Sequence, residues 1–159
     1  MLNETKITAD PTDYALILEQ ARALFGEETH QIAGLANASA LIFHALKGLN
    51  WAGFYLLEDQ TLILGPFQGK VACVKIPLGH GVCGTAAKED RMLIVDDVHR
   101  FPGHIACDGA SRSEIVIPLH QNGRVAGVLD LDSPLLSRFT KADGVGLSAL
   151  ARLIESALF

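Results

Sequence analysis

The sequence lacks any excess of basic residues, since 13 Lys and Arg stand against 18 Asp and Glu and the formal net charge is −5. A chain with this balance has no broad positive field, which makes nucleic acids and anionic membrane surfaces poor partners. It also contains no run of about 20 apolar residues, the length that a membrane-spanning helix needs. The N-terminus shows no signal-peptide pattern, so we expect a cytoplasmic protein.

Cysteine is scarce as well, with Cys73, Cys83 and Cys107 as the three in 159 residues. Three cysteines cannot all pair within one chain, and a chain of this length buries enough apolar surface to fold without disulfides. No Cys-x-x-Cys pair is present, and the wide spacing is unlike that of structural zinc sites. We therefore expect no metal and no bound cofactor, in a compartment that keeps thiols reduced.

The sequence has no repeats, linkers or low-complexity tracts, and its length is typical of one domain. We expect a single domain over residues 1–159, with residues 1–9 as a flexible N-terminus. Apolar residues recur at helical spacing over residues 10–26, where Asp10 is the expected N-cap and Pro11 takes the first helical position.

Two further helices are predicted at residues 29–48 and from Thr140 to the C-terminus, the latter opened by a variant of the capping box. Between the helices, short β-rich runs predict strands at 51–57, 61–64, 71–76 and 92–95 and a hairpin over 113–131. With one short helix among some six strands, the pattern indicates an α+β domain with a mainly antiparallel sheet. That order disfavours a dinucleotide-binding role for the glycines at 79, 81 and 84, which need a parallel βαβ unit.

Three carboxylates fall on the predicted hairpin. Asp130 and Asp132 are two residues apart and project from the same face of a strand. A two-residue loop at 122–123 would put Glu114 on the opposite face, whereas a three-residue loop at 121–123 pairs Glu114 with Asp130 and gathers all three acids. The alternation of apolar residues favours the three-residue loop. Such a patch needs a cation or a shared proton, unless it is only a solvated strand end.

The three thiols have different predicted surroundings. Cys73 lies in a predicted strand among apolar residues, which favours a buried, inert thiol. Cys83 lies at the start of a helix, where the helix dipole lowers the pKa of a thiol. Cys107 lies in the long, non-periodic loop of residues 96–112, close in sequence to His104, and it can be reactive or inert.

Trp51 and Tyr55 are four residues apart near a strand and should share one face. Such a pair is explained by core packing, but it also suits the aromatic wall of a small-ligand pocket. Both interpretations stay open at this point.

Six segments together closely resemble the free methionine-(R)-sulfoxide reductases, which are stand-alone GAF domains: 50–55, 64–69, 81–86, 101–108, 111–115 and 127–133. The resemblance implies a single GAF-like domain, a six-stranded sheet with the N- and C-terminal helices packed on one side. It implies that the Cys107 thiolate attacks the sulfoxide sulfur and becomes a sulfenic acid, and that Cys73 resolves it as a disulfide reduced by thioredoxin. Cys83 matches the remaining family cysteine, an auxiliary or alternative resolver.

The resemblance also assigns the acids and the aromatic pair to the substrate. Glu114, Asp130 and Asp132 would jointly hold the ammonium group and activate the sulfoxide, with Glu114 counted among the catalytic residues. Trp51 would pack against the methyl end of the substrate, beside Tyr55. The family further suggests a homodimer. The alternative function is a GAF-type module that senses a small molecule or redox state without turnover.

Overall fold

The computed structural model describes residues 11–26, 30–105 and 107–159. The expected flexible segment 1–9, the expected N-cap Asp10 and the expected helix start at Thr29 lie outside the described residues.

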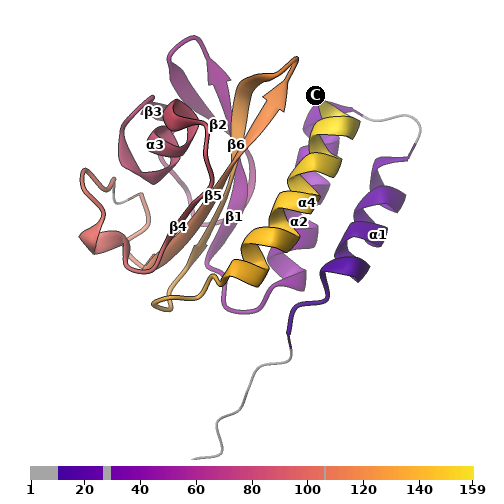
Figure 1. The fold of residues 1–159 in the computed structure, drawn as a ribbon, viewed down its shortest axis with the longest axis horizontal. Coiled ribbons are helices and arrows are strands. Elements are labelled where there is room, and N and C mark those ends of the chain that lie inside the picture. The colour runs from indigo at the N-terminus through magenta and orange to yellow at the C-terminus, as the bar shows by residue number, and fades with distance from the viewer. Residues whose placement is uncertain (1–10, 27–29, 106) are drawn as a thin grey trace, which may run out of the picture.

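The core element is one antiparallel sheet with the strand order β3-β2-β1-β6-β5-β4 (Figure 1). Its strands are β1 (Trp51–Glu58), β2 (Thr61–Gly69), β3 (Lys75–Pro77), β4 (Leu93–Val95), β5 (Ser113–Gln121) and β6 (Arg124–Ser133). Every pair of neighbouring strands is antiparallel, which confirms the predicted α+β class. Among the described residues, the sheet has no parallel βαβ unit of the kind that a dinucleotide fingerprint requires.

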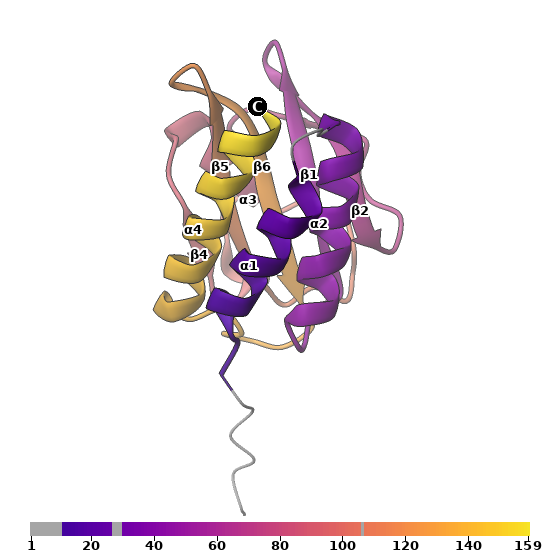
Figure 2. The ribbon, with the colours of Figure 1, turned by 90° about the vertical axis from the view of Figure 1, so that its right-hand side faces the viewer.

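The helices divide between the two faces of the sheet. On one face lie α2 (Gln31–Ala45) and α4 (Lys141–Leu158), and α1 (Tyr14–Phe25) packs against both of them (Figures 1 and 2). On the other face lie α3 (Gly81–Glu89) and the short 3-10 helix η1 (Val98–Arg100). The terminal helices therefore cover one side, as expected.

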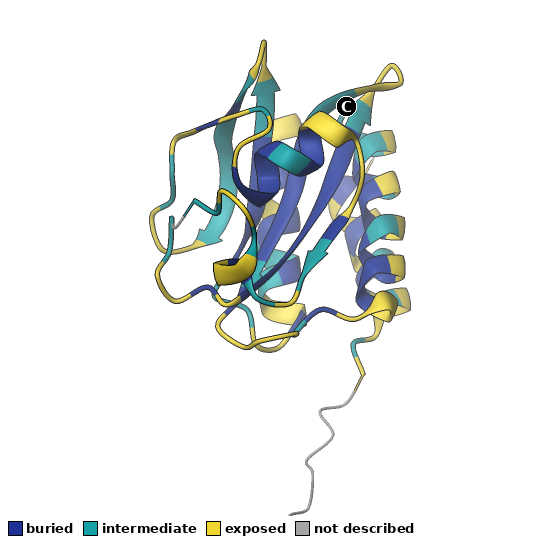
Figure 3. Ribbon diagram, turned by 60° about the vertical axis from the view of Figure 1, so that its left-hand side comes forward, coloured by how far each residue is buried: buried dark blue, intermediate teal, exposed yellow. Residues whose placement is uncertain are grey.

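The main core fills the space between the sheet and the three long helices. Alternate strand residues such as Phe54, Ile115 and Leu131 point to this face and are fully buried against Leu35 and Leu147 of the helices. Figure 3 shows that burial is concentrated along the central strands. Because side chains alternate along a strand, the neighbouring residues of β1, β5 and β6 face the opposite side, where the cavity described below lies.

The N-cap of α1 differs from the prediction. Pro11 lies outside the helix, and the carboxylate of Asp13 accepts a hydrogen bond (3.0 Å) from the backbone N–H of Leu16. The helix starts at Tyr14, whose hydroxyl donates to Asp143 of α4 at 2.6 Å. The first residue of α1 thus contacts α4, which is far away in the sequence. A sequence pattern within residues 10–26 cannot indicate such a contact.

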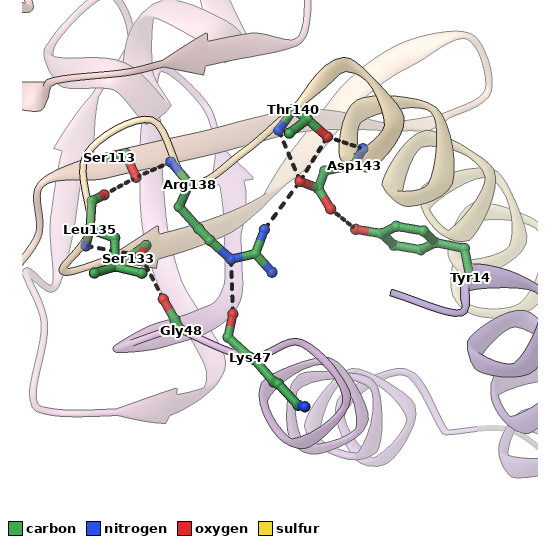
Figure 4. A network of polar contacts seen from close by, with 9 residues as sticks. All are labelled: Tyr14, Lys47, Gly48, Ser113, Ser133, Leu135, Arg138, Thr140 and Asp143. Carbon is green, nitrogen blue, oxygen red and sulfur yellow. Dashed lines mark hydrogen bonds and ion pairs between the residues drawn. The ribbon is translucent and has the colours of Figure 1, made fainter. Parts of the chain in front are cut away.

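A polar network joins the helices to the lower end of the sheet (Figure 4). Asp143 accepts from Tyr14, from the guanidinium of Arg138 at 3.1 Å, and from Thr140, with which it forms the predicted capping box. Gly146 is required beside it, since a Cβ there would lie 2.2 Å from the Tyr14 ring. The network fixes the loop that follows β6.

The turn between β5 and β6 has two residues, Asn122 and Gly123, so the predicted three-residue loop 121–123 is wrong. Asn122 and Gly123 both have positive φ, +52° and +74°, and Gln121 pairs directly with Arg124. These values are typical of a two-residue turn that matches the twist of the strands, for which Asn-Gly is the preferred sequence.

A β-bulge places Glu114 on the same face of the sheet as the two aspartates, although the two-residue turn alone would place it on the opposite face. The register shifts by one residue between Leu119 and His120, so Glu114 pairs with Asp132 rather than with Asp130. Since one slip in register exchanges the two faces of a strand, the bulge returns Glu114 to the face of both aspartates. The predicted gathering of the acids is correct, although the predicted loop and pairing are wrong.

Candidate functional site

A cavity lies on the face of the sheet opposite the three long helices. Its empty volume is about 530 Å³, which includes solvent space at its open mouth. The strands β1, β5 and β6 supply Trp51, Tyr55, Glu114, Asp130 and Asp132. Its lining is completed by Gly81, Val82 and Cys83 of α3 and by Val71, Ala72, Ile76, His80, His104, Ile105, Cys107, Asp108 and Ser111. Every site residue predicted from the sequence except Cys73 lines this one cavity, and Cys73 is bonded to a lining residue.

A disulfide joins Cys73 to Cys107, with their Cα atoms 5.4 Å apart. This is the pairing that the resemblance implies. Cys73 lies outside any strand, contrary to the prediction, because β3 begins only at Lys75. The carbonyl oxygen of Cys73 instead accepts a hydrogen bond (2.9 Å) from the hydroxyl of Tyr55. Cys107 lies in the loop between η1 and β5, as predicted.

The three acids are crowded and withdrawn from solvent. Glu114 and Asp130 are 6% and 5% exposed, and Asp132 is partly buried beside them. Burial raises the pKa of Glu114 and of Asp132 well above the ordinary range, and the neighbouring Asp130 charge raises both further. Burial also raises the pKa of Asp130, but hydrogen bonds from Glu114, Cys83 and Asp132 oppose this rise. Asp130 is therefore best placed to hold the negative charge, with protons on its neighbours.

Two buried polar atoms of the cavity residues have no hydrogen-bond partner within the described part of the chain. They are Oδ1 of Asp130, an acceptor, and Nε1 of Trp51, a donor. Buried polar groups are nearly always paired in native proteins. A ligand that carries both a donor, such as an ammonium group, and an acceptor oxygen would satisfy both atoms.

Cys83 is a buried free thiol that contacts the acids. It lies near the start of α3, and its Sγ donates to Oε1 of Glu114 at 3.7 Å. Burial raises its pKa far above the ordinary value, and the charges of Asp130 and Glu114 add to the effect. The predicted lowering by the helix dipole is therefore wrong, because desolvation and nearby carboxylates outweigh it. Cys83 remains protonated at neutral pH.

The aromatic pair forms one wall of the cavity. The rings of Trp51 and Tyr55 stack with centroids 5.9 Å apart, and Phe67 stacks on the other side of Trp51 at 5.2 Å. Both residues are buried, on the shared face that their spacing predicts. The Tyr55 pKa is raised by burial and by the nearby Asp130, so the phenol keeps its proton.

Cys83, Glu114 and Asp130 are also a group whose ligand atoms lie within 4.8 Å of one another, a separation compatible with a shared cation. The cysteine spacing gave no sign of this group, since two of its members are carboxylates from β5 and β6. The charge on the buried Asp130 carboxylate would favour a positively charged group at this position.

This chain is similar in sequence to proteins of known family. A model of the GAF domain matches residues 33–158. The free methionine-R-sulfoxide reductase of Escherichia coli is 54% identical over 145 residues, which cover 91% of this chain and 88% of that protein. The chain belongs to the GAF-domain family of free methionine-R-sulfoxide reductases. The family resemblance carried by the six sequence segments is thereby confirmed.

Solved structures share the fold of this GAF domain. The reduced form of fRMsr from Staphylococcus aureus has a TM-score of 0.91 at 52% identity and covers 94% of this chain and 97% of its own. The free methionine-R-sulfoxide reductase from Neisseria meningitidis, in complex with its substrate, has a TM-score of 0.88 at 44% identity and covers 91% of this chain and 87% of its own. In the described part of this GAF domain, no helix is long and apolar enough to cross a membrane.

Sequence reasoning missed three residues beside the cavity of this GAF domain. Asn50 hydrogen-bonds through its side chain to Asp108 and Ser111, which follow Cys107 in the chain. All three are terminal residues of the quoted motif segments, but none has a periodicity or spacing that marks it. Only the fold brings the start of β1 beside the loop.

Proposed function

We propose that this protein reduces free L-methionine-(R)-sulfoxide to L-methionine. The observation that carries the proposal is the Cys73–Cys107 disulfide beside a cavity that contains three crowded carboxylates. The relatives named above for this activity support it, since the chain matches nearly their full length.

In the first step, the thiolate of Cys107 attacks the sulfur of the sulfoxide. The sulfur–oxygen bond of the substrate breaks, and the oxygen and a proton end on Cys107 as a sulfenic acid while methionine leaves. The substrate sulfur is reduced by two electrons, and the Cys107 sulfur is oxidised by two.

In the second step, the thiol of Cys73 attacks the sulfenic acid, so that a disulfide forms and water leaves. Thioredoxin then supplies two electrons and two protons to return both thiols. We propose a cytoplasmic setting, because thioredoxin keeps thiols reduced there. Cys83, with its raised pKa, is a poor nucleophile and at most an auxiliary thiol.

The acids divide two tasks in this reaction. The carboxylate of Asp130 holds the substrate ammonium, which supplies the missing partner for its buried Oδ1. Glu114 or Asp132, protonated because of its raised pKa, donates the proton that the sulfoxide oxygen needs. Trp51 packs against the methyl end, beside Tyr55. A peptide-bound sulfoxide has no ammonium group and would leave the acids without a cation, so it should be refused.

The test is methionine release from reduced protein and NADPH oxidation coupled through thioredoxin and its reductase. We expect turnover with the free R epimer and none with the S epimer or a peptide-bound sulfoxide. Cys107→Ser should abolish methionine release, and Cys73→Ser should release about one methionine per chain before thioredoxin-driven turnover slows. A sensor module would bind the sulfoxide without releasing methionine, and wild-type behaviour of Cys107→Ser would refute the enzyme.

We also propose a homodimer, as the family suggests. Exposed apolar side chains on α1 and α2, such as Leu16, Leu24 and Ile32, are candidate contact residues. Light scattering coupled to gel filtration should give twice the chain mass of 17.0 kDa, and a mass of one chain would refute it.

A further inference from the structure

The side chain of Asn50 ties the loop of Cys107 to the sheet. Its Nδ2 donates to Oδ2 of Asp108 and to Oγ of Ser111, both at 3.0 Å. Asp108 directly follows Cys107, and Ser111 lies two residues before β5. One amide group, from the residue before β1, therefore holds both ends of residues 108–111.

The tied segment is itself a compact turn. The Oδ1 of Asp108 accepts from the backbone N–H of Ala110 at 2.9 Å, and the backbone N–H of Ser111 donates to the carbonyl of Asp108 at 3.2 Å. The pKa of Asp108 is lowered, mainly by the Ala110 N–H and also by the Asn50 amide. The carboxylate form of Asp108 is thus the one that suits this contact.

Asn50 also contacts the strand that carries the acids. Its backbone N–H donates to the carbonyl oxygen of Asp132 at 3.0 Å. The side chain of Ser111 also acts on the carboxyl group of Asp132, where it opposes the rise in pKa that burial causes. Residues from two distant parts of the chain, the Cys107 loop and the acid strand, therefore meet at Asn50.

We propose that Asn50 is a positioning residue that holds Cys107 in register with the acids. This inference rests on the proposed function, in which the Cys107 sulfur must lie near the substrate sulfur and then near Cys73. A displacement of about 1 Å between reacting groups can lower a rate by about 100-fold. The turn that follows Cys107 is hydrogen-bonded to Asn50 at the edge of the sheet, and these bonds limit such a displacement of Cys107.

The test compares three variants in single-turnover methionine release from reduced protein at saturating substrate. Asn50→Ala removes both side-chain hydrogen bonds and should slow release about tenfold or more. Asn50→Asp places a carboxylate against Asp108 and should slow it at least as much. The exchange Asn50→Asp with Asp108→Asn restores an amide-to-carboxylate contact in the opposite direction and should recover most of the rate lost in Asn50→Asp.

The matched control is Asn37→Asp, the same chemical change on the exposed side of α2. It should release methionine at the wild-type rate. Thermal unfolding of every variant separates a positioning effect from misfolding, since all should remain folded at the assay temperature. Recovery in the exchange variant is a readout that a general loss of stability would not produce.

A second readout does not depend on activity. In dithiothreitol redox buffers, a looser loop lowers the effective concentration of Cys107 near Cys73, so the disulfide of Asn50→Ala should be about threefold or more easier to reduce. If wild-type protein releases no methionine, the proposed function fails while this equilibrium still decides the role of Asn50. Single variants within twofold of wild type in both measurements, or an exchange variant no faster than Asn50→Asp, would overturn the proposal.

Discussion

At the scale of single residues, the chemistry of the cavity depends on which of its three acids are protonated and which one is charged. Burial raises the pKa of all three acids, but the neighbouring side chains Glu114, Cys83 and Asp132 oppose the rise at Asp130, whereas the Asp130 charge adds to the rise at Glu114 and Asp132. The site therefore combines one carboxylate with two proton-bearing acids. In the proposed reaction, the carboxylate of Asp130 binds the substrate ammonium group, and a protonated neighbouring acid donates to the sulfoxide oxygen.

Replacing Asp130 with Asn keeps the shape of the side chain and removes its charge. Because a hydrogen bond between charged groups contributes about 1.5–3 kcal/mol, we expect the KM for free methionine-(R)-sulfoxide to rise about tenfold or more. Steady-state kinetics with the thioredoxin-coupled assay measures this. Glu19→Gln, on the exposed surface of α1, is the control and should behave as wild type. An unchanged KM for Asp130→Asn would show that the ammonium is bound elsewhere.

At the scale of elements, His120 of β5 clamps two helices. Its Nε2 lies 2.6 Å from Asp90, which caps the end of α3, and its Nδ1 lies 2.8 Å from Glu155 of α4. A neutral imidazole can donate from only one nitrogen, so this geometry suits the doubly protonated ring. Although burial alone would lower the pKa of His120, the two carboxylates raise it overall.

The clamp predicts a pH-dependent contribution to stability. The pKa of His120 is higher in the folded than in the unfolded protein, where it is about 6.5. The charged His120 therefore stabilises the fold fully below about pH 6.5, and this stabilisation is lost as the pH rises through the folded-state pKa. His120→Gln should lower the free energy of unfolding by about 1 kcal/mol at pH 6, with a smaller difference at pH 9. Urea unfolding across this range measures it, with the exposed His44→Gln as control. A difference that grows with pH would contradict the clamp.

At the scale of the whole molecule, the disulfide joins residues 34 positions apart and encloses β3, α3 and β4. Of these, α3 packs on the acid face of the sheet and β3 and β4 are the two edge strands, while the three long helices cover the main core on the other side. The redox state of one bond therefore constrains the half of the molecule that contains the cavity.

Reduction of that disulfide should lower the free energy of unfolding by about 4 kcal/mol, because it frees a loop of this length in the unfolded chain. Urea unfolding of the wild-type protein with and without a phosphine reductant measures the change. Cys107→Ser cannot form the bond, so its unfolding curves should coincide in both conditions. Coincident curves for the wild-type protein would refute the prediction.

Several features were predictable because they depend on short stretches of chain. The alternation of apolar residues in β5 and β6, the capping box at Thr140 and the helical spacing near both termini are local signals, and each appears in the structure. The six motif segments identify the family for the same reason, since each is a contiguous run of residues.

Other features depend on contacts between residues far apart in the sequence. The bulge after Leu119 pairs Glu114 with Asp132, and desolvation by the assembled site, not the helix dipole, sets the pKa of Cys83. The hydrogen bonds of Asn50 span about 60 positions of the chain. Local patterns specify which segments form helices and strands, whereas register, burial and charge environment arise only when those segments pack together.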